Sequence, residues 1–117
     1  MRHLKEGKKF NRVTGERRAF LRNLANALIR TGKIETTETR AKAIRPIVER
    51  LITIAKKQNL ASRRLIISRL DNQRTAKKLF EEISPKYQGR SGGYLRIIKS
   101  GKSRKRDGAR LATIEFI

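Results

Sequence analysis

Hydrophobic residues recur at helical spacing through the first three quarters of the chain. Phe20, Leu24 and Leu28 are spaced by four residues, which predicts a helix over about residues 16–30. Arginines recur at the same spacing on another side of this helix. The pattern therefore indicates an amphipathic helix with one apolar side and one basic side.

A short strand and a second helix are expected next. Residues 33–37 are rich in β-branched side chains, which favours a strand. Thr37 can then cap a helix whose apolar residues recur from Ala41 to Ala55. Because Pro46 falls inside this repeat, we expect the helix to kink or to restart there.

Two further helices and a hairpin complete the predicted secondary structure. Apolar spacing predicts helices over residues 59–70 and 76–83, and the second should end near Pro85. Side chains then alternate over residues 94–99 and 111–116, which predicts two antiparallel strands. The elements together indicate an α/β chain of the α+β class, with helices packed on a small mixed sheet that includes this C-terminal hairpin.

Charge divides the chain into a globular domain with two basic extensions. The sequence holds 31 Lys and Arg against 10 Asp and Glu, a formal net charge of +21 in 117 residues. A basic arm is expected over residues 1–13, and a single globular domain over 14–117 with a basic hairpin loop at 100–108. Self-repulsion on this scale destabilises a compact chain unless a polyanion neutralises it, and nucleic acid is the partner that fits best.

Several other classes of function are disfavoured by what the sequence lacks. With no cysteine and only one histidine, His3, it offers no disulfide, thiolate site or ordinary catalytic triad. The glycines at 89, 92 and 93 form no phosphate-binding loop, and no two carboxylates form a catalytic motif. No apolar run is long enough to cross a bilayer, and we expect the mature protein to begin near Met1 in a reducing compartment. We predict no enzyme, cofactor, metal site, membrane contact or small-molecule substrate.

The distribution of aromatic residues favours recognition of RNA backbone and shape. Sheet-based RNA readers stack bases on aromatic side chains, but only Tyr94 and Phe116 fall on the predicted strands. The helices at 59–70 and 76–83 could imitate a helix-turn-helix, yet they carry less excess positive charge than the arm and hairpin. A body with two basic extensions suits the crevices of a large folded RNA. A general DNA- or RNA-binding architectural protein is the alternative, and an RNA-processing enzyme is a weaker one.

Several short segments together resemble one known family. The most specific is Lys78-Leu79-Phe80-x-Glu82-Ile83-x-Pro85-x-Tyr87, followed by Arg90-x-Gly92-Gly93-Tyr94-x-Arg96-Ile97. The others are Met1-Arg2-His3 with Lys5, Gly7, Asn11 and Arg12; Arg22-Asn23; Thr36-Thr37 with Ala41-Lys42; and Leu51-Ile52-Thr53-x-Ala55-Lys56. Over essentially its whole length the chain resembles the bacterial large-subunit ribosomal protein numbered seventeen.

The resemblance implies a structural component of the large ribosomal subunit that binds the large-subunit ribosomal RNA. It also implies a position near the outer end of the polypeptide exit tunnel, beside neighbouring ribosomal proteins, in a cytoplasmic or organellar ribosome. The sequence departs from the family at Glu16, where histidine is frequent, and at Arg110, where proline is common. We expect Glu16 to serve a helix N-terminus rather than RNA, and the last strand to begin differently.

Basic charge and the family resemblance together select the candidate RNA contacts. In the arm they are Arg2, His3, Lys5, Lys8, Lys9 and Arg12. In the helical part they are Arg17, Arg18, Arg22, Asn23, Arg40 and Lys42. In the hairpin and the segment before it they are Arg90, Tyr94, Arg96, Lys99, Lys102, Arg104, Lys105 and Arg106.

Overall fold

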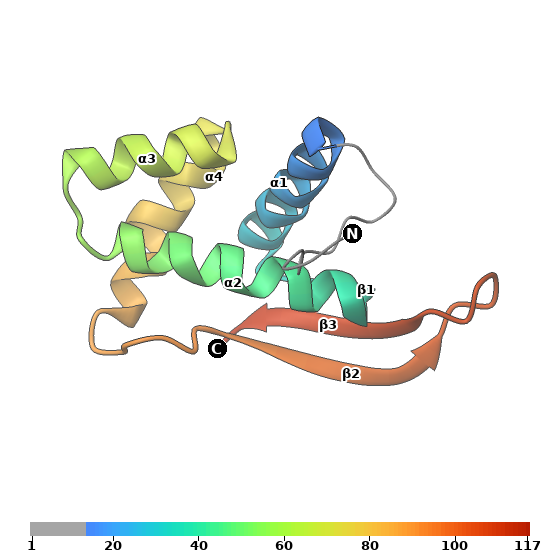
Figure 1. The fold of residues 1–117 in the computed structure, drawn as a ribbon. Helices are drawn as coiled ribbons and strands as arrows, with labels where there is room; N and C mark the ends of the chain where they lie inside the picture. The colour runs from blue at the N-terminus through green and yellow to red at the C-terminus, as the bar shows by residue number, and fades with distance from the viewer. Residues whose placement is uncertain (1–13) are drawn as a thin grey trace, which may run out of the picture.

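The computed structural model describes residues 14–117, so the predicted arm over 1–13 lies outside the described residues. The helical elements are α1 (Thr14–Thr31), α2 (Glu38–Ala55), α3 (Leu60–Leu70), α4 (Gln73–Lys78), a π-helical turn (Leu79–Ile83) and a 3-10 turn (Ser84–Tyr87). The strands are β1 (Lys33–Thr37), β2 (Leu95–Ser103) and β3 (Arg110–Phe116). Figure 1 shows the helices gathered on one side of the sheet, with the β2–β3 hairpin extending beyond them. The predicted α+β class is confirmed.

Helix α2 runs without interruption through Pro46. The expected kink or restart does not divide it, because Pro46 lies on the exposed side of the helix. Proline removes one backbone hydrogen bond, the one to the carbonyl of Lys42, and its ring stays outside the core. Thr37 caps the start as predicted, its side chain accepting a hydrogen bond from the backbone N–H of Arg40. Among residues 14–117, no helix has the length and apolar character that crossing a bilayer requires.

Asparagine caps define the two shorter helices. Asn59 and Ser62 form a capping box at the start of α3, each side chain bonded to the other residue's backbone N–H. The Asn72 side chain accepts hydrogen bonds from the first turn of α4. The chain then stays helical through a π turn and a 3-10 turn to Tyr87, which lies beyond the predicted end near Pro85. Pro85 is tolerated because it lies in the first turn of the 3-10 segment, where a backbone N–H would have no helical partner.

The sheet is antiparallel throughout, in the order β1-β3-β2. The predicted mixed sheet is therefore corrected in this detail: β1 pairs with the last strand in antiparallel register, Ile34 opposite Ile114. Helix α2 contacts all three strands. Ala112 and Ile114 of the central strand are fully buried, so one face of the sheet closes the core.

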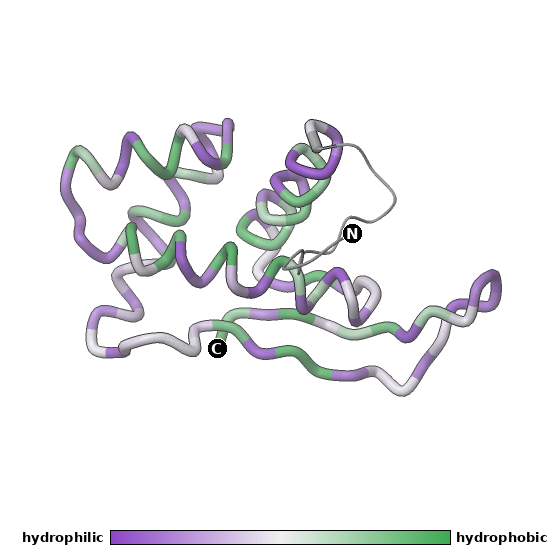
Figure 2. Tube along the Cα trace, in the orientation of Figure 1, coloured by the Kyte–Doolittle hydropathy of each residue, from purple (hydrophilic) through white to green (hydrophobic). Residues whose placement is uncertain are grey.

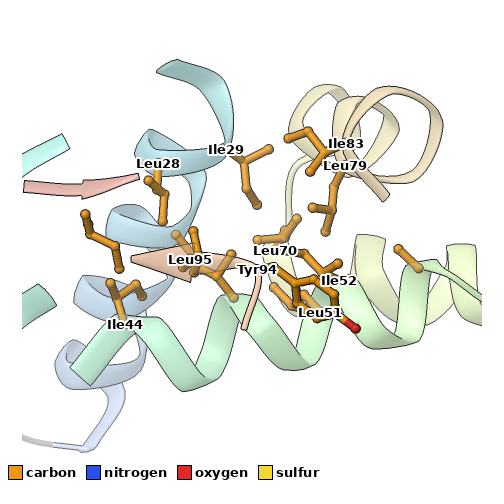
Figure 3. Close-up of a cluster of buried hydrophobic side chains, with 14 of the residues drawn as sticks. Leu28, Ile29, Ile44, Leu51, Ile52, Leu70, Leu79, Ile83, Tyr94 and Leu95 are labelled. Carbon is orange, nitrogen blue, oxygen red and sulfur yellow. The ribbon is translucent and has the colours of Figure 1, made fainter. Parts of the chain in front are cut away.

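One cluster of buried side chains joins the helices to the sheet. Figure 3 shows Leu28 and Ile29 of α1 packed near Ile52 of α2, with Leu70 at the end of α3 and Leu95 at the start of β2. Each of these five is at most 1% exposed. Along the Cα trace in Figure 2, hydrophobic and hydrophilic stretches alternate through the helices, whereas the end of the hairpin is hydrophilic.

Asn26 ties three helices together inside this core. Its side-chain amide donates hydrogen bonds to the carbonyl oxygens of Arg22 and Leu70, each at 3.0 Å. Its carbonyl oxygen accepts a hydrogen bond from the hydroxyl of Thr75, which is buried in α4. Asn26 therefore helps to set the position of α1 relative to the end of α3 and the start of α4, together with core packing and the hydrogen bond from Lys78 to the Arg30 carbonyl.

We predict that Asn26→Ala lowers the free energy of unfolding by about 2 kcal/mol, because it leaves the Leu70 carbonyl and the Thr75 hydroxyl without this partner. Urea unfolding followed by circular dichroism measures the change. Asn23→Ala is the control, since Asn23 lies exposed on the same helix and should change stability by less than about 0.5 kcal/mol. Equal effects of the two substitutions would contradict the assignment.

Candidate nucleic-acid interface

The tip of the β2–β3 hairpin carries exposed positive charge without local neutralisation. Its loop is shorter than the predicted 100–108, because β2 continues to Ser103 and β3 begins at Arg110. Lys102, Lys105 and Arg106 are exposed, and none of them forms an ion pair within residues 14–117. These three cations are free to contact an external anion.

Arg104 and Asp107 hold the loop in shape. The guanidinium and the carboxylate meet in two hydrogen bonds, at 2.6 and 3.1 Å. The same carboxylate accepts a hydrogen bond at 3.1 Å from the backbone N–H of Ala109. The hydrogen bond from Arg104 is the main cause that lowers the pKa of the Asp107 carboxyl. Arg104, a predicted RNA contact, therefore acts inside the loop and helps present Lys105 and Arg106.

A bulge in β2 places Lys102 near the tip. Between the pairs Lys99–Ala112 and Ser103–Arg110, three residues of β2 lie opposite one residue of β3. Gly101 adopts a φ of +74° there, a conformation that other residues rarely accept. The bulge interrupts the ladder and turns the hairpin end relative to the sheet.

The predicted contacts on α1 differ in how exposed they are. Arg18 and Asn23 are exposed, and Arg17 and Arg22 are half-buried. Arg18 and Arg22 line a groove together with two arginines that sequence reasoning did not select, Arg50 of α2 and Arg69 of α3. Neither stands out in the sequence, because α2 and α3 carry other exposed arginines, Arg45 and Arg64 among them, and the three helices meet only in the fold.

Lys42 and Lys99 are both engaged by one carboxylate. Their ammonium groups lie 3.0 and 3.5 Å from Oε1 of Glu38, at the start of α2. The hydrogen bond from Lys42 is the main cause that lowers the pKa of the Glu38 carboxyl, and Lys99 contributes to it. Through Glu38, Lys99 of the hairpin is linked to α2, and the positive charges of Lys42 and Lys99 are partly neutralised within the protein.

The other predicted arginines also have partners inside the protein. The guanidinium of Arg40 lies 5.0 Å from the ring centroid of Phe20. Arg90 donates from Nε to the carbonyl oxygen of Gly92, and Nε of Arg96 lies 2.7 Å from Oε1 of Glu115. Arg90 and Arg96 are exposed, so their remaining N–H groups can still reach an external acceptor.

Tyr94 is removed from the candidate contacts, because its side chain is buried and cannot stack on a base. It is 1% exposed and lies among core side chains in Figure 3. Its ring packs against Tyr87 at 5.3 Å between centroids, and its hydroxyl accepts a hydrogen bond from Lys56 at 2.9 Å. Burial alone would raise the pKa of the Tyr94 phenol, but the hydrogen bonds from Lys56 and Thr53 and the charge of Lys56 outweigh it and lower the pKa.

The remaining predicted contacts, Arg2, His3, Lys5, Lys8, Lys9 and Arg12, lie outside the described residues. Within the described part of the chain, no three His, Cys, Asp or Glu side chains gather closely enough to hold a metal ion. The surface features that stand out over residues 14–117 are thus positively charged ones.

Comparison with known proteins identifies the family. The model of the family described as ribosomal protein L17 matches residues 20–117. A large ribosomal subunit protein bL17 of Persephonella marina is 52% identical, over 100% of this chain and 95% of the relative. Proteins of the same name from Hydrogenobaculum sp. and Thermus thermophilus are 48% and 44% identical, over 100% of this chain and 99% of each relative. The chain belongs to the ribosomal protein L17 family.

The two departures from the usual L17 pattern have a local explanation. Glu16 is exposed in the first turn of α1, where a carboxylate interacts favourably with the positive end of the helix. Arg110 is the first residue of β3, one position before the predicted start of the strand, and pairs with Ser103. Unlike proline, arginine retains the backbone N–H that a ladder position can use.

We predict that Tyr94→Phe lowers the free energy of unfolding by about 1–2 kcal/mol, because it removes the acceptor of the Lys56 hydrogen bond from a buried site. The salt dependence of RNA binding should not change. Urea unfolding and filter binding at several salt concentrations measure the two quantities. Unchanged stability together with a smaller salt slope would restore Tyr94 as an RNA contact.

The Arg104–Asp107 pair should persist through mild acid. Because the pKa of Asp107 in the folded chain is below its usual 3.8, the pair's contribution is complete above pH 3.8 and is lost as the pH falls through the lowered pKa. We predict that the NMR shift of the Ala109 amide, which bonds this carboxylate, titrates with a midpoint below 3.8. Asp107→Asn should abolish the transition, and a midpoint at or above 3.8 would be inconsistent with the pair.

Proposed function

We propose that this chain is a structural constituent of the large ribosomal subunit that binds and braces large-subunit ribosomal RNA during assembly and translation. Its membership of the L17 family makes it a ribosomal protein of the bacterial type, which belongs to the cytoplasmic ribosome. The relatives carry the name large ribosomal subunit protein, which supports the choice of subunit. Neighbouring large-subunit proteins near the outer end of the exit tunnel are its proposed protein partners.

The observation that carries the RNA-binding part is the uncompensated charge at the hairpin tip. Lys102, Lys105 and Arg106 are exposed and unpaired within residues 14–117, on a loop that the Arg104–Asp107 pair helps to shape. Phosphate groups bind such cations with release of counterions, and a projecting hairpin can enter a crevice of folded RNA. The tip suits backbone contact, since it presents no aromatic side chain to a base.

The basic side of α1 and the arm complete the proposed contact surface. Arg17, Arg18, Arg22 and Asn23 lie on the helix that follows the arm, and each is exposed or half-buried. Arg90 and Arg96 stay in the proposed set through their exposed N–H groups. Lys42 and Lys99 contribute less, because each is held by Glu38. The six arm residues are proposed contacts on sequence grounds alone.

Replacing the three tip cations should weaken binding in a way that salt reveals. We predict that Lys102→Gln, Lys105→Gln and Arg106→Gln combined reduce the salt slope for large-subunit ribosomal RNA by about three, roughly one per lost phosphate contact. The measurement is filter binding of the full chain at several potassium chloride concentrations.

The control removes the same charges from the folded body. Lys57→Gln, Arg74→Gln and Lys77→Gln combined also replace two lysines and one arginine, all exposed and remote from the tip. An equal loss in both triple variants would mean that net charge alone drives binding, which favours the general nucleic-acid-binding alternative. Sedimentation of a cell extract in high salt tests the assignment to the subunit: the chain should stay with the large subunit, and recovery with DNA or at the top of the gradient would overturn it.

A further inference from the structure

Four arginines from three different helices surround one groove on the helical side of the molecule. The groove has a volume of about 820 Å³ and is lined by Arg18, Leu21, Arg22, Ile47, Arg50 and Arg69. Helices α1, α2 and α3 contact one another, and Figure 1 shows α1 and the end of α3 converging above α2. The groove therefore lies where the three helices meet.

The groove is positively charged and not neutralised by the protein. No carboxylate lines it. None of the four guanidinium groups forms an ion pair within residues 14–117. Four like charges facing one open hollow repel one another, so the arrangement favours an anion between them.

The arginines stand on a rigid support. Asn26 joins α1 to the carbonyl of Leu70, the residue directly after Arg69. Leu70 is 1% exposed and Leu51, which follows Arg50, is 2% exposed, so the backbone beside each of these arginines is fixed by core packing. A preorganised cluster loses less conformational freedom when it binds than a loop of the same charge would.

We propose that this arginine groove is a second RNA-binding site, which holds the phosphate backbone of an RNA segment different from the one at the hairpin tip. The proposal rests on the proposed function and adds a site to it. Arginine engages phosphate through two parallel hydrogen bonds, and four guanidinium groups around one groove match the closely repeated charges of a phosphodiester chain. The apolar side chains of Leu21 and Ile47 between them can pack against ribose, which a site for free inorganic anions would not need.

Two separate sites would make the protein a brace between RNA segments. The groove lies among the helices, whereas the tip lies at the far end of the hairpin, beyond the helical layer (Figure 1). One rigid body bound at both places would fix the relative position of two strands of a folded RNA.

The first test removes the two groove arginines that lie outside α1. Arg50→Gln with Arg69→Gln should reduce the salt slope for large-subunit ribosomal RNA by about two, roughly one per arginine. Arg64→Gln with Arg74→Gln is the matched control, because both are exposed helical arginines outside the groove. Both variants should melt at the temperature of the unmodified chain or slightly above it, since each relieves repulsion between like charges.

The second test locates the RNA directly. Because the sequence has no cysteine, a single introduced thiol can carry an iron chelate that cleaves nearby RNA. Ser68→Cys places it on α3 beside Arg69, and Ser103→Cys places it at the base of the tip; both serines are exposed. We expect the two positions to cleave different stretches of the RNA, and the Ser68→Cys cleavage to vanish when Arg50→Gln and Arg69→Gln are added.

The outcomes separate this site from the proposed function. If the unmodified chain does not bind large-subunit ribosomal RNA more tightly than an unrelated duplex, the proposed function and the groove proposal both fail. If it does bind, but the groove variant has the same slope as its control, only the groove proposal is overturned. The proposal is also overturned if the chelate at Ser68→Cys yields no RNA cleavage, or cleavage that persists when Arg50→Gln and Arg69→Gln are added.

Discussion

Helix α2 provides the buried surface on which the rest of the described chain is assembled. Its six buried residues repeat every three or four positions: Ala41, Ile44, Val48, Leu51, Ile52 and Ala55. It contacts α1 and α3 on one side and all three strands on the other. With 35% of the sequence charged and only 37% hydrophobic, this narrow apolar stripe has to support most of the core. The charged residues are consequently displaced to the outer sides of the elements that pack on α2.

Two carboxylates, those of Glu38 and Asp107, hold neighbouring lysine and arginine side chains in position. Glu38 links the start of α2 to the hairpin through Lys42 and Lys99. Asp107 closes the tip loop on Arg104. Each pair is exposed enough that its net contribution to stability is small, but it sets the position of neighbouring cations. Asp107 pairs with Arg104 and no carboxylate lines the arginine groove, so Lys102, Lys105, Arg106 and the groove arginines form no ion pair within residues 14–117 and are available for phosphate.

The spacing of apolar residues predicted α1, α2, α3 and the two hairpin strands, because a small core requires a regular apolar stripe on each element. It placed the fourth helix across α4 and the π turn after it, and it did not predict the 3-10 turn or the continuation of β2 to Ser103. Periodicity was not sufficient at Pro46, because only the fold reveals that this proline lies on the exposed side of a continuous helix. The sequence analysis also assigned Tyr94 to the surface, as an RNA contact, whereas the fold buries it. Tyr94 immediately precedes a strand of alternating side chains, and the sequence does not reveal that Tyr87 and Lys56 enclose it.

The candidate site was predictable only in part, for a related reason. Charge concentrated in one segment, as in the hairpin loop, is visible in the sequence. A charge cluster assembled from separate helices is not visible in the sequence, because Arg50 and Arg69 become neighbours of Arg18 only when three helices converge. Conversely, Arg104 appears in the sequence as one more basic residue, whereas the fold engages it with Asp107.

The two unneutralised surfaces differ in how firmly they are held, and this bears on how such a protein would bind. The groove arginines stand on helices anchored in the core, so their backbone is ordered before any ligand arrives. The tip is a loop beyond a bulged strand, shaped mainly by one exposed ion pair. Ordering a loop on binding costs conformational entropy that a preformed site does not incur. The groove is therefore suited to recognise RNA that is already folded, and the tip to adapt to a crevice that closes around it as the RNA completes its structure.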